Sequence, residues 1–402
     1  MNMQTITARG ASLCRCVGAL MLVAMCGLAA QAQAARGPTA QAQAGQGPAA
    51  QDQAGRPPTP SPAEAPLQGG RIGYVMTHLF WSIYQSPDAK ADCPKGYNIG
   101  PRGQFSALFP PGKPHTLVDS QLSQEAQTWN PNGKPDSFPF YEPVGPTAVG
   151  MNLDGRTGPN DFTSPTGEHG IDNQLFRALG CIEGFRGPQG VEFVFEDKAI
   201  ADRRYNRVML ELSGVESLVN DNDVTVTLFR GMDRLLTDAT GNKIIPGGSQ
   251  HIDLRWGRTL IRRMKGKIIN GVLSTEPIKE LVIPWMNLDV PTTQIIKDMR
   301  LQLKLTPTSA EGMIGGYADV DTFYYQLCRN DSTHHLSNGD ISAISLYKAL
   351  LRLADAYPDP KTGAHTAISS ALDAKFVQVY INPLTDAEQK QLTALALANT
   401  GI

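Results

Sequence analysis

The sequence predicts a mainly β protein, an antiparallel β-sandwich or jelly roll with long irregular loops and a C-terminal helical segment. Three observations lead to this prediction. Apolar and polar residues alternate within residues 191–330, Asn270-Gly271 stands between two runs of β-forming residues, and prolines and glycines interrupt residues 71–190. Alternation with a period of two is typical of a strand with one buried face, and Asn-Gly is typical of a tight hairpin turn.

The strands of the predicted β-sandwich core, residues 191–330, follow from three alternating stretches. In each stretch every second residue is a large aliphatic one, and the residues between are mostly polar or charged. The aliphatic positions are Val208, Leu210 and Leu212, then Val224, Val226 and Leu228, then Leu301, Leu303 and Leu305. One face of each strand is therefore expected to pack on the core while the other meets water.

Residues 71–190 are expected to be a loop-rich segment packed on this core. They open with an apolar and aromatic run from Ile72 to Tyr84, which suits a buried helix or a core strand equally, because periodicity does not separate the two. The runs 109–114 and 130–135 are rich in proline, glycine and asparagine, which interrupt regular elements. Loops of this length often carry function.

Residues 331–402 are expected to be helical. Asp340 can cap a first helix, and Pro358 ends it. The run from Thr366 to Val379 suits a second helix. Thr385-Asp386-Ala387-Glu388 is a capping-box pattern that opens a third.

The N-terminal part carries a targeting signal and a linker. Basic residues, an apolar run from Val17 to Ala30 and small residues ending at Ala34 follow one another, as in a cleavable secretory signal peptide over residues 1–34. This run is shorter than the roughly 20 residues that span a bilayer, and no later run is longer. Lipidation at Cys26 is the alternative, although Met25 before it is not the usual small residue. Residues 35–70, rich in Ala, Gln, Gly and Pro, are expected to be a disordered linker.

We therefore expect an extracytoplasmic protein, periplasmic or secreted, without a transmembrane segment. Three cysteines follow the predicted signal peptide, Cys93, Cys181 and Cys328, and an oxidising compartment permits one disulfide among them. Cys93 with Cys181 is the favoured pair, because both lie in loop-rich sequence that a covalent link would stabilise. The other two pairings remain open.

The charge of the chain gives no reason to expect nucleic acid as a partner. The formal net charge is −2 at pH 7, so there is no global attraction to nucleic acid or to anionic lipid. No GxGxxG or Walker-type phosphate loop occurs either. The basic run from Arg255 to Lys267 could meet phosphate or an acidic polysaccharide, but a charged strand face or a guarded sheet edge explains it better.

The glycine-rich loop from Asn152 to Asn173 is the strongest candidate for a metal site. Ca²⁺ takes about six to eight oxygens from carboxylates, amides and carbonyls on such a loop. The oxygen-bearing side chains of this loop are Asp154, Asn160, Asp161, Glu168, Asp172 and Asn173. Their spacing departs from the EF-hand order, and Asx-turns are an alternative explanation of the same composition. Calcium is the one cofactor that the sequence suggests.

The function that the sequence favours is a non-catalytic binding or structural protein of unknown ligand, with a glycan or an envelope protein as the partner. Aromatic faces stack on sugar rings, and the sequence offers Trp81, Trp129, Tyr141 and Trp256, each of which also suits a core position. An accessory subunit of an envelope complex, recognisable by a large apolar patch, is another hypothesis.

A secreted hydrolase is the rival hypothesis. Asp154, Asp161 or Glu168 would then be catalysts in a cleft above the sheet, which requires two carboxylates to converge in a pocket, one of them with a raised pKa. No Gly-x-Ser-x-Gly elbow occurs, and Ser249 near His251 is a weak candidate for a serine nucleophile.

Overall fold

The structure is a computed structural model that describes residues 67, 69–98, 140–186, 200, 207–256, 261–287, 290–330 and 343–398. The predicted signal peptide and nearly all of the predicted linker lie outside these residues. None of the helices within the described ranges is long and apolar enough to cross a bilayer.

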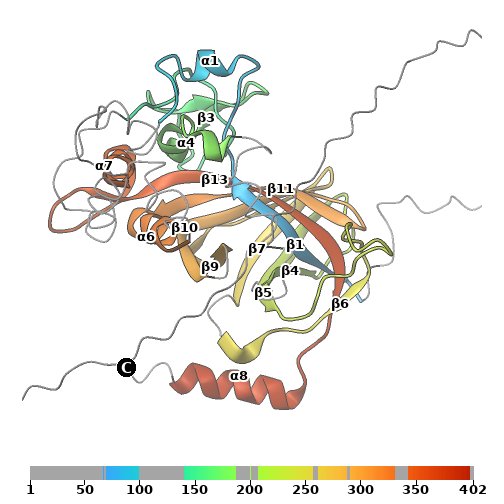
Figure 1. Ribbon diagram of the computed structural model, residues 1–402. Helices are drawn as coiled ribbons and strands as arrows, with labels where there is room; N and C mark the ends of the chain where they lie inside the picture. The colour runs from blue at the N-terminus through green and yellow to red at the C-terminus, as the bar shows by residue number, and fades with distance from the viewer. Residues whose placement is uncertain are drawn as a thin grey trace, which may run out of the picture. The chain divides into compact units, whose positions relative to one another are not determined.

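Eight antiparallel strands form a closed barrel (Figure 1). Each strand pairs with the next in the order given below, and the last, β13, pairs with the first, β1, so the sheet closes. The strands are β1 (Arg71–Trp81), β4 (Arg207–Ser213), β5 (Asp221–Gly231), β7 (Arg262–Ile269), β8 (Val272–Thr275), β10 (Val290–Leu305), β11 (Ser309–Asp319) and β13 (His365–Ile381). The prediction of a mainly β, antiparallel fold is confirmed. Its sandwich and jelly-roll forms are not confirmed, because one sheet closes on itself.

The inside of the barrel is a packed hydrophobic core. The predicted aliphatic positions of β4, β5 and β10 all belong to it, together with Tyr74 and Met76 of β1 and Leu372 and Phe376 of β13. Closure removes the free strand edges that an open sheet would expose. Because the interior is filled by side chains, the surfaces on which this barrel can meet a ligand are its outer wall and its ends.

The predicted Asn-Gly turn is confirmed. Asn270 and Gly271 join β7 to β8, with Ile269 paired with Val272 across the turn. Their φ angles are 52° and 79°. Asparagine and glycine are the residues that adopt such left-handed backbone at least cost, which is why this pair predicts the hairpin.

Further strands extend the sheet beyond the barrel. Strand β9 (Ile278–Asn287) pairs with β10, and β12 (Ala356–Pro358) pairs with β13. Strand β6 (Gly248–Gln250) runs parallel to the C-terminal end of β13. A short helix η3 (Leu254–Trp256) follows β6.

Within the described residues, three longer helices accompany the barrel. They are α6 (Val320–Asn330), α7 (Ala343–Leu353) and α8 (Asp386–Ala398). Helix α6 contacts β10, and α7 contacts β13 and α6. In Figure 1, α8 lies near β6, at the other end of the molecule from α7.

The prediction of a helix over Thr366 to Val379 is wrong, because these residues lie in strand β13. Three small or charged residues separate Ile368 from Leu372 and Leu372 from Phe376, and this spacing of four resembles a helix. Every residue from 367 to 372 is buried, so both faces of this part of the strand are covered and no alternation appears. The run from Ile72 to Tyr84, for which helix and strand were both open, contains β1.

A disulfide-linked cover, residues 140–186 with residues 89–98, packs against the first half of β13. It contains α1 (Ala89–Asp92), β2 (Phe162–Thr163), β3 (His169–Ile171), α4 (Gln174–Leu179) and η2 (Glu183–Phe185). Cys93 and Cys181 form a disulfide, with their Cα atoms 5.8 Å apart. Beside it, buried Arg186 forms an ion pair with Asp92 at 2.8 Å. The cover and the β6 end of the barrel lie at opposite ends of β13 (Figure 1).

Candidate functional site

The loop singled out for calcium has its innermost carboxylate, Asp172, held by backbone groups. Asp172 Oδ2 accepts hydrogen bonds from the Leu153 amide at 2.6 Å and from the Asp154 amide at 3.3 Å. Asn173 caps α4, since its Oδ1 accepts from the Phe176 amide at 3.2 Å and its Nδ2 donates to Val149 O at 2.7 Å. Both side chains thereby fix the fold of the loop.

The other predicted oxygen ligands lie toward solvent. Asp154 Oδ1 accepts from the Arg156 amide at 2.8 Å, which makes an Asx-turn, and Asp161 Oδ2 accepts from the Gly158 amide three residues before it. Asn160 and Glu168 are exposed. Within the described residues, no group of three or more His, Cys, Asp or Glu side chains is arranged to hold a metal ion. Calcium binding by this loop stays a prediction.

The carboxyl of Asp172 has a raised pKa. Burial raises its pKa to about 6, and the nearby carboxylates of Asp154 and Asp161 add to the rise, while its two backbone hydrogen bonds oppose it. The loop acids named for hydrolysis differ in position, since Asp154 and Glu168 are exposed and Asp161 is half-buried. The hydrolase hypothesis stays untested by this arrangement.

The aromatic residues that the sequence offered for ligand stacking are placed as follows. Trp81 is buried, and its ring packs edge-on against Phe323 with centroids 5.1 Å apart, so it belongs to the core. Tyr141 is half-buried, and its backbone is bonded to the side chain of Asn98. Trp129 and the side chain of Trp256 lie outside the part of the molecule that the structure describes.

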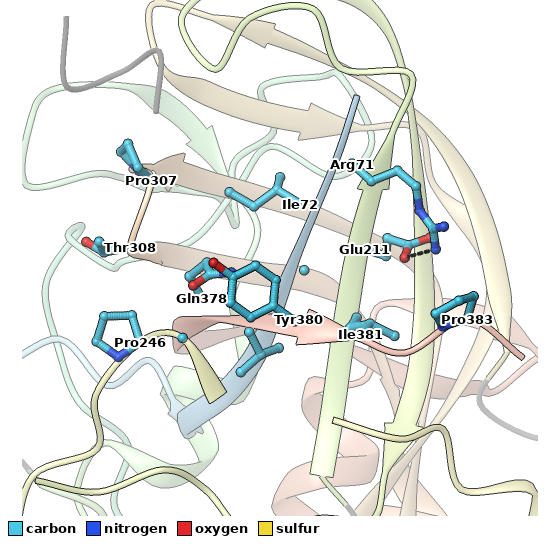
Figure 2. A pocket seen from close by; sticks show the side chains of 13 residues that line it. Arg71, Ile72, Glu211, Pro246, Pro307, Thr308, Gln378, Tyr380, Ile381 and Pro383 are labelled. Carbon is cyan, nitrogen blue, oxygen red and sulfur yellow. Dashed lines mark hydrogen bonds and ion pairs between the residues drawn. The ribbon is translucent and has the colours of Figure 1, made fainter. Parts of the chain in front are cut away.

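The structure reveals a different site, a groove of about 510 Å³ at the end of the barrel, which we call the Tyr380 groove (Figure 2). Strands β1, β4 and β13 contribute to its lining, together with the turn before β6 and the turn between β10 and β11. The lining residues are Arg71, Ile72, Gly73, Glu211, Pro246, Gly247, Pro307, Thr308, Gln378, Val379, Tyr380, Ile381 and Pro383.

The two turns are held against β13 at Gln378. The Gln378 amide donates to Thr308 O at 2.9 Å, and Gln378 O accepts from the Gly247 amide at 3.0 Å. Gly73 allows β1 to lie close to β13, since a Cβ on it would come within 2.8 Å of Val379 O and of the Ile381 side chain. The shape of the groove is therefore set by backbone hydrogen bonds and by a residue without a side chain.

Tyr380 is the exposed aromatic side chain of the groove. Residues alternate between the two faces of the sheet at the end of β13, so Gln378 and Tyr380 lie on the same face as Phe376 of the barrel core, whereas Val377 and Val379 are buried on the other face. Gln378 and Tyr380 therefore leave the sheet at the end of the barrel. Tyr380 keeps 46 % of its surface exposed. Burial of a large aromatic side chain in a contact is favourable, so this exposed ring is suited to bind a ligand. Figure 2 shows its ring beside the Gln378 side chain.

An ion pair also lines the groove. Arg71 at the start of β1 is paired with Glu211 of β4, and Glu211 is largely buried while the guanidinium is partly open. A guanidinium has five N–H donors and a carboxylate about four acceptor sites, so the pair retains hydrogen-bonding capacity toward the groove. Prolines 246, 307 and 383 and Ile72 supply apolar walls.

No motif in the sequence indicates this groove, because its parts come from positions far apart in the chain. Tyr380 itself lies in the segment expected to be helical, so its exposed position in a strand is not predicted. The alternation of Val377, Val379 and Ile381 with Gln378 and Tyr380 is the signal that could have identified it.

Comparison with known proteins adds no further information on the site. No protein-family model matches the chain, and no curated protein or solved structure matches it either.

Proposed function

We propose that the chain is an extracytoplasmic, non-catalytic binding protein that holds a neutral glycan in the Tyr380 groove. The observation that carries this proposal is the exposed ring of Tyr380 beside Gln378, in a groove of about 510 Å³ whose lining also includes the Arg71–Glu211 pair. Ligand sites generally combine apolar walls with a few fixed polar groups, and this groove has both.

The chemistry of the lining fits a sugar better than an ion. A pyranose ring offers an apolar C–H face to an aromatic ring and hydroxyls, which donate and accept, to planar polar side chains. Glu211 and Arg71 neutralise each other, so the groove carries no uncompensated charge of its own that would select a charged ligand. Gln378 provides both a donor and an acceptor beside the ring.

Two observations support the extracytoplasmic location. The order of basic, apolar and small residues over 1–34 fits a secretory signal peptide. The Cys93–Cys181 disulfide fits an oxidising compartment, where such bonds persist. A fusion of residues 1–70 to alkaline phosphatase, which is active only after export, tests the location, and an inactive fusion would contradict it.

Calorimetry with neutral oligosaccharides tests the ligand class. The probes are maltohexaose, cellohexaose and chitohexaose, and the proposal expects at least one to bind the wild-type protein. Tyr380→Ala should weaken that binding about tenfold or more, because it removes the stacking face. Tyr325→Ala is the matched control, since Tyr325 on α6 is similarly exposed, at 50 %, but lies outside the groove. Binding by none of the three probes, or equal binding by both variants, would overturn the proposal.

A further inference from the structure

A polar network continues the surface of the Tyr380 groove along β6. Tyr380 of β13 is the register partner of Ser249 of the parallel strand β6, so their side chains leave the sheet on the same side. Asn382 follows Tyr380 by two residues and His251 follows Ser249 by two, which puts all four on one face. Asn382 itself stands between Ile381 and Pro383, which both line the groove.

Hydrogen bonds join these side chains into one chain of contacts. Ser249 Oγ donates to Asn382 Oδ1 at 3.2 Å, and the side-chain nitrogen Nδ2 of Asn382 lies 2.9 Å from His251 Nε2. On the other side of the ring, His251 Nδ1 lies 2.9 Å from Asp233 Oδ2. A backbone hydrogen bond also fixes the position of Asn382, because its backbone amide donates to Gln250 O at 2.9 Å.

The network is ordered and yet open to solvent. The side chain of His251 is 60 % exposed and that of Asp233 is 36 % exposed. Exposed polar side chains usually move independently in water. The four side chains of this network, Ser249, Asn382, His251 and Asp233, come from three separate segments and are joined by hydrogen bonds. Such an arrangement presents donors and acceptors in a fixed geometry, which lowers the entropy lost when a ligand binds.

We propose that Ser249, Asn382 and His251 form a second subsite that binds a more distant sugar ring of a glycan held on Tyr380, beyond the neighbour of the ring on Tyr380. This inference rests on the proposed function, because Tyr380 supplies the first subsite. A sugar hydroxyl both donates and accepts, as do the serine hydroxyl and the asparagine amide. Asp233 is a positioning residue, since its carboxylate orients the His251 ring through Nδ1.

The subsite predicts that affinity depends on the length of the glycan. A disaccharide fills only the Tyr380 position and its nearest neighbour, whereas a tetrasaccharide reaches across Asn382 whichever way the chain runs. We therefore expect the tetrasaccharide to bind the wild-type protein about tenfold more tightly than the disaccharide of the same series. The probes are maltose and maltotetraose, cellobiose and cellotetraose, and chitobiose and chitotetraose.

Asn382→Ala should remove this advantage and leave disaccharide binding unchanged. His251→Gln is a second variant, which keeps a polar side chain and should reduce the advantage in part. Asn222→Ala, at an exposed asparagine of β5 outside the groove, is the matched control and should behave as the wild-type protein. Circular dichroism verifies that each variant is folded.

The outcomes separate the subsite from the proposed function. Equal affinity for both lengths in the wild-type protein, or a length advantage that survives in both Asn382→Ala and His251→Gln, would overturn the subsite and leave the Tyr380 groove standing. Binding of neither length in any series would overturn both.

Discussion

Tyr357 and Asp298 are joined by a hydrogen bond of 2.7 Å from the tyrosine hydroxyl to Asp298 Oδ2, and both residues have left-handed backbone, with φ of 58° and 48°. Such backbone is costly for residues with a side chain, and costlier for a bulky one. Asp298 lies at the irregularity in the pairing of β10 with β11, and Tyr357 lies in β12. The bond thus holds two strained positions together.

The Tyr357–Asp298 contact should show measurable coupling in a double-mutant cycle. Asp298→Gly removes the carboxylate without adding strain, and Tyr357→Phe removes only the hydroxyl. We expect a coupling free energy of about 1–2 kcal/mol in urea denaturation, as for a hydrogen bond to a charged group. Tyr347→Phe is a control for the loss of a tyrosine–aspartate bond on ordinary helical backbone, because Tyr347 donates to Asp321 Oδ1 at 2.8 Å. A coupling near zero would show that the two strained positions are held independently.

Removal of the disulfide should destabilise the cover before the barrel. The disulfide joins residues 88 apart in sequence, and none of the eight barrel strands lies between Cys93 and Cys181 in the chain. Cys93→Ser with Cys181→Ser should cost about 2–5 kcal/mol, with faster amide exchange in residues 140–186 than in β4 and β5. Hydrogen exchange followed by mass spectrometry measures this. Uniform acceleration through the barrel would contradict it.

Asp172 should make stability depend on pH in a defined direction. Its pKa of about 6 in the folded protein is above its usual value, so folding favours the neutral carboxyl. The stabilisation is therefore complete below about pH 4, the pKa of an unfolded aspartate, and is lost as the pH rises through 6.

Comparison with Asp172→Asn isolates this contribution. The free energy of unfolding of the wild-type protein should fall by about 1–3 kcal/mol more than that of the variant between about pH 4 and about pH 8. An asparagine oxygen can still accept from the Leu153 amide, so the loop should keep its fold. The same fall in both proteins would show that Asp172 is not the group responsible.

Calcium binding by the Asn152–Asn173 loop can be tested by thermal unfolding. If the loop binds Ca²⁺ as its composition suggests, added Ca²⁺ should raise the unfolding midpoint, and Asp161→Asn with Asp172→Asn should remove that rise. Mg²⁺, which requires stricter octahedral geometry, is the control ion. An unchanged midpoint would mean that the hydrogen bonds within the loop account for its composition.

The sequence predicts the strands in which aliphatic residues occupy every second position. In β10 the residues between them, Gln302 and Lys304, meet water, whereas β4 is buried on both faces and the expected wet face is absent there. The Asn270-Gly271 turn is set by local backbone preference. β13 escapes prediction because the cover buries its outer face and removes the alternation. Closure of the barrel is a long-range property, since β1 and β13 lie at opposite ends of the described chain.

The Tyr380 groove escapes prediction for a similar reason. Arg71 and Tyr380 are brought together only by the pairing of β1 with β13, and no spacing in the sequence encodes that contact. The loop acids, in contrast, are visible in the sequence because they are contiguous, and the structure gives them local roles in turns and in an α4 cap.

Amide chemical-shift mapping during titration with the tightest-binding tetrasaccharide tests the glycan groove most directly. The account predicts that the largest shift changes occur at residues 71–73 and 378–381, and that Tyr380→Ala removes them. Shift changes centred on the cover, or no changes with any of the three tetrasaccharides, would contradict it.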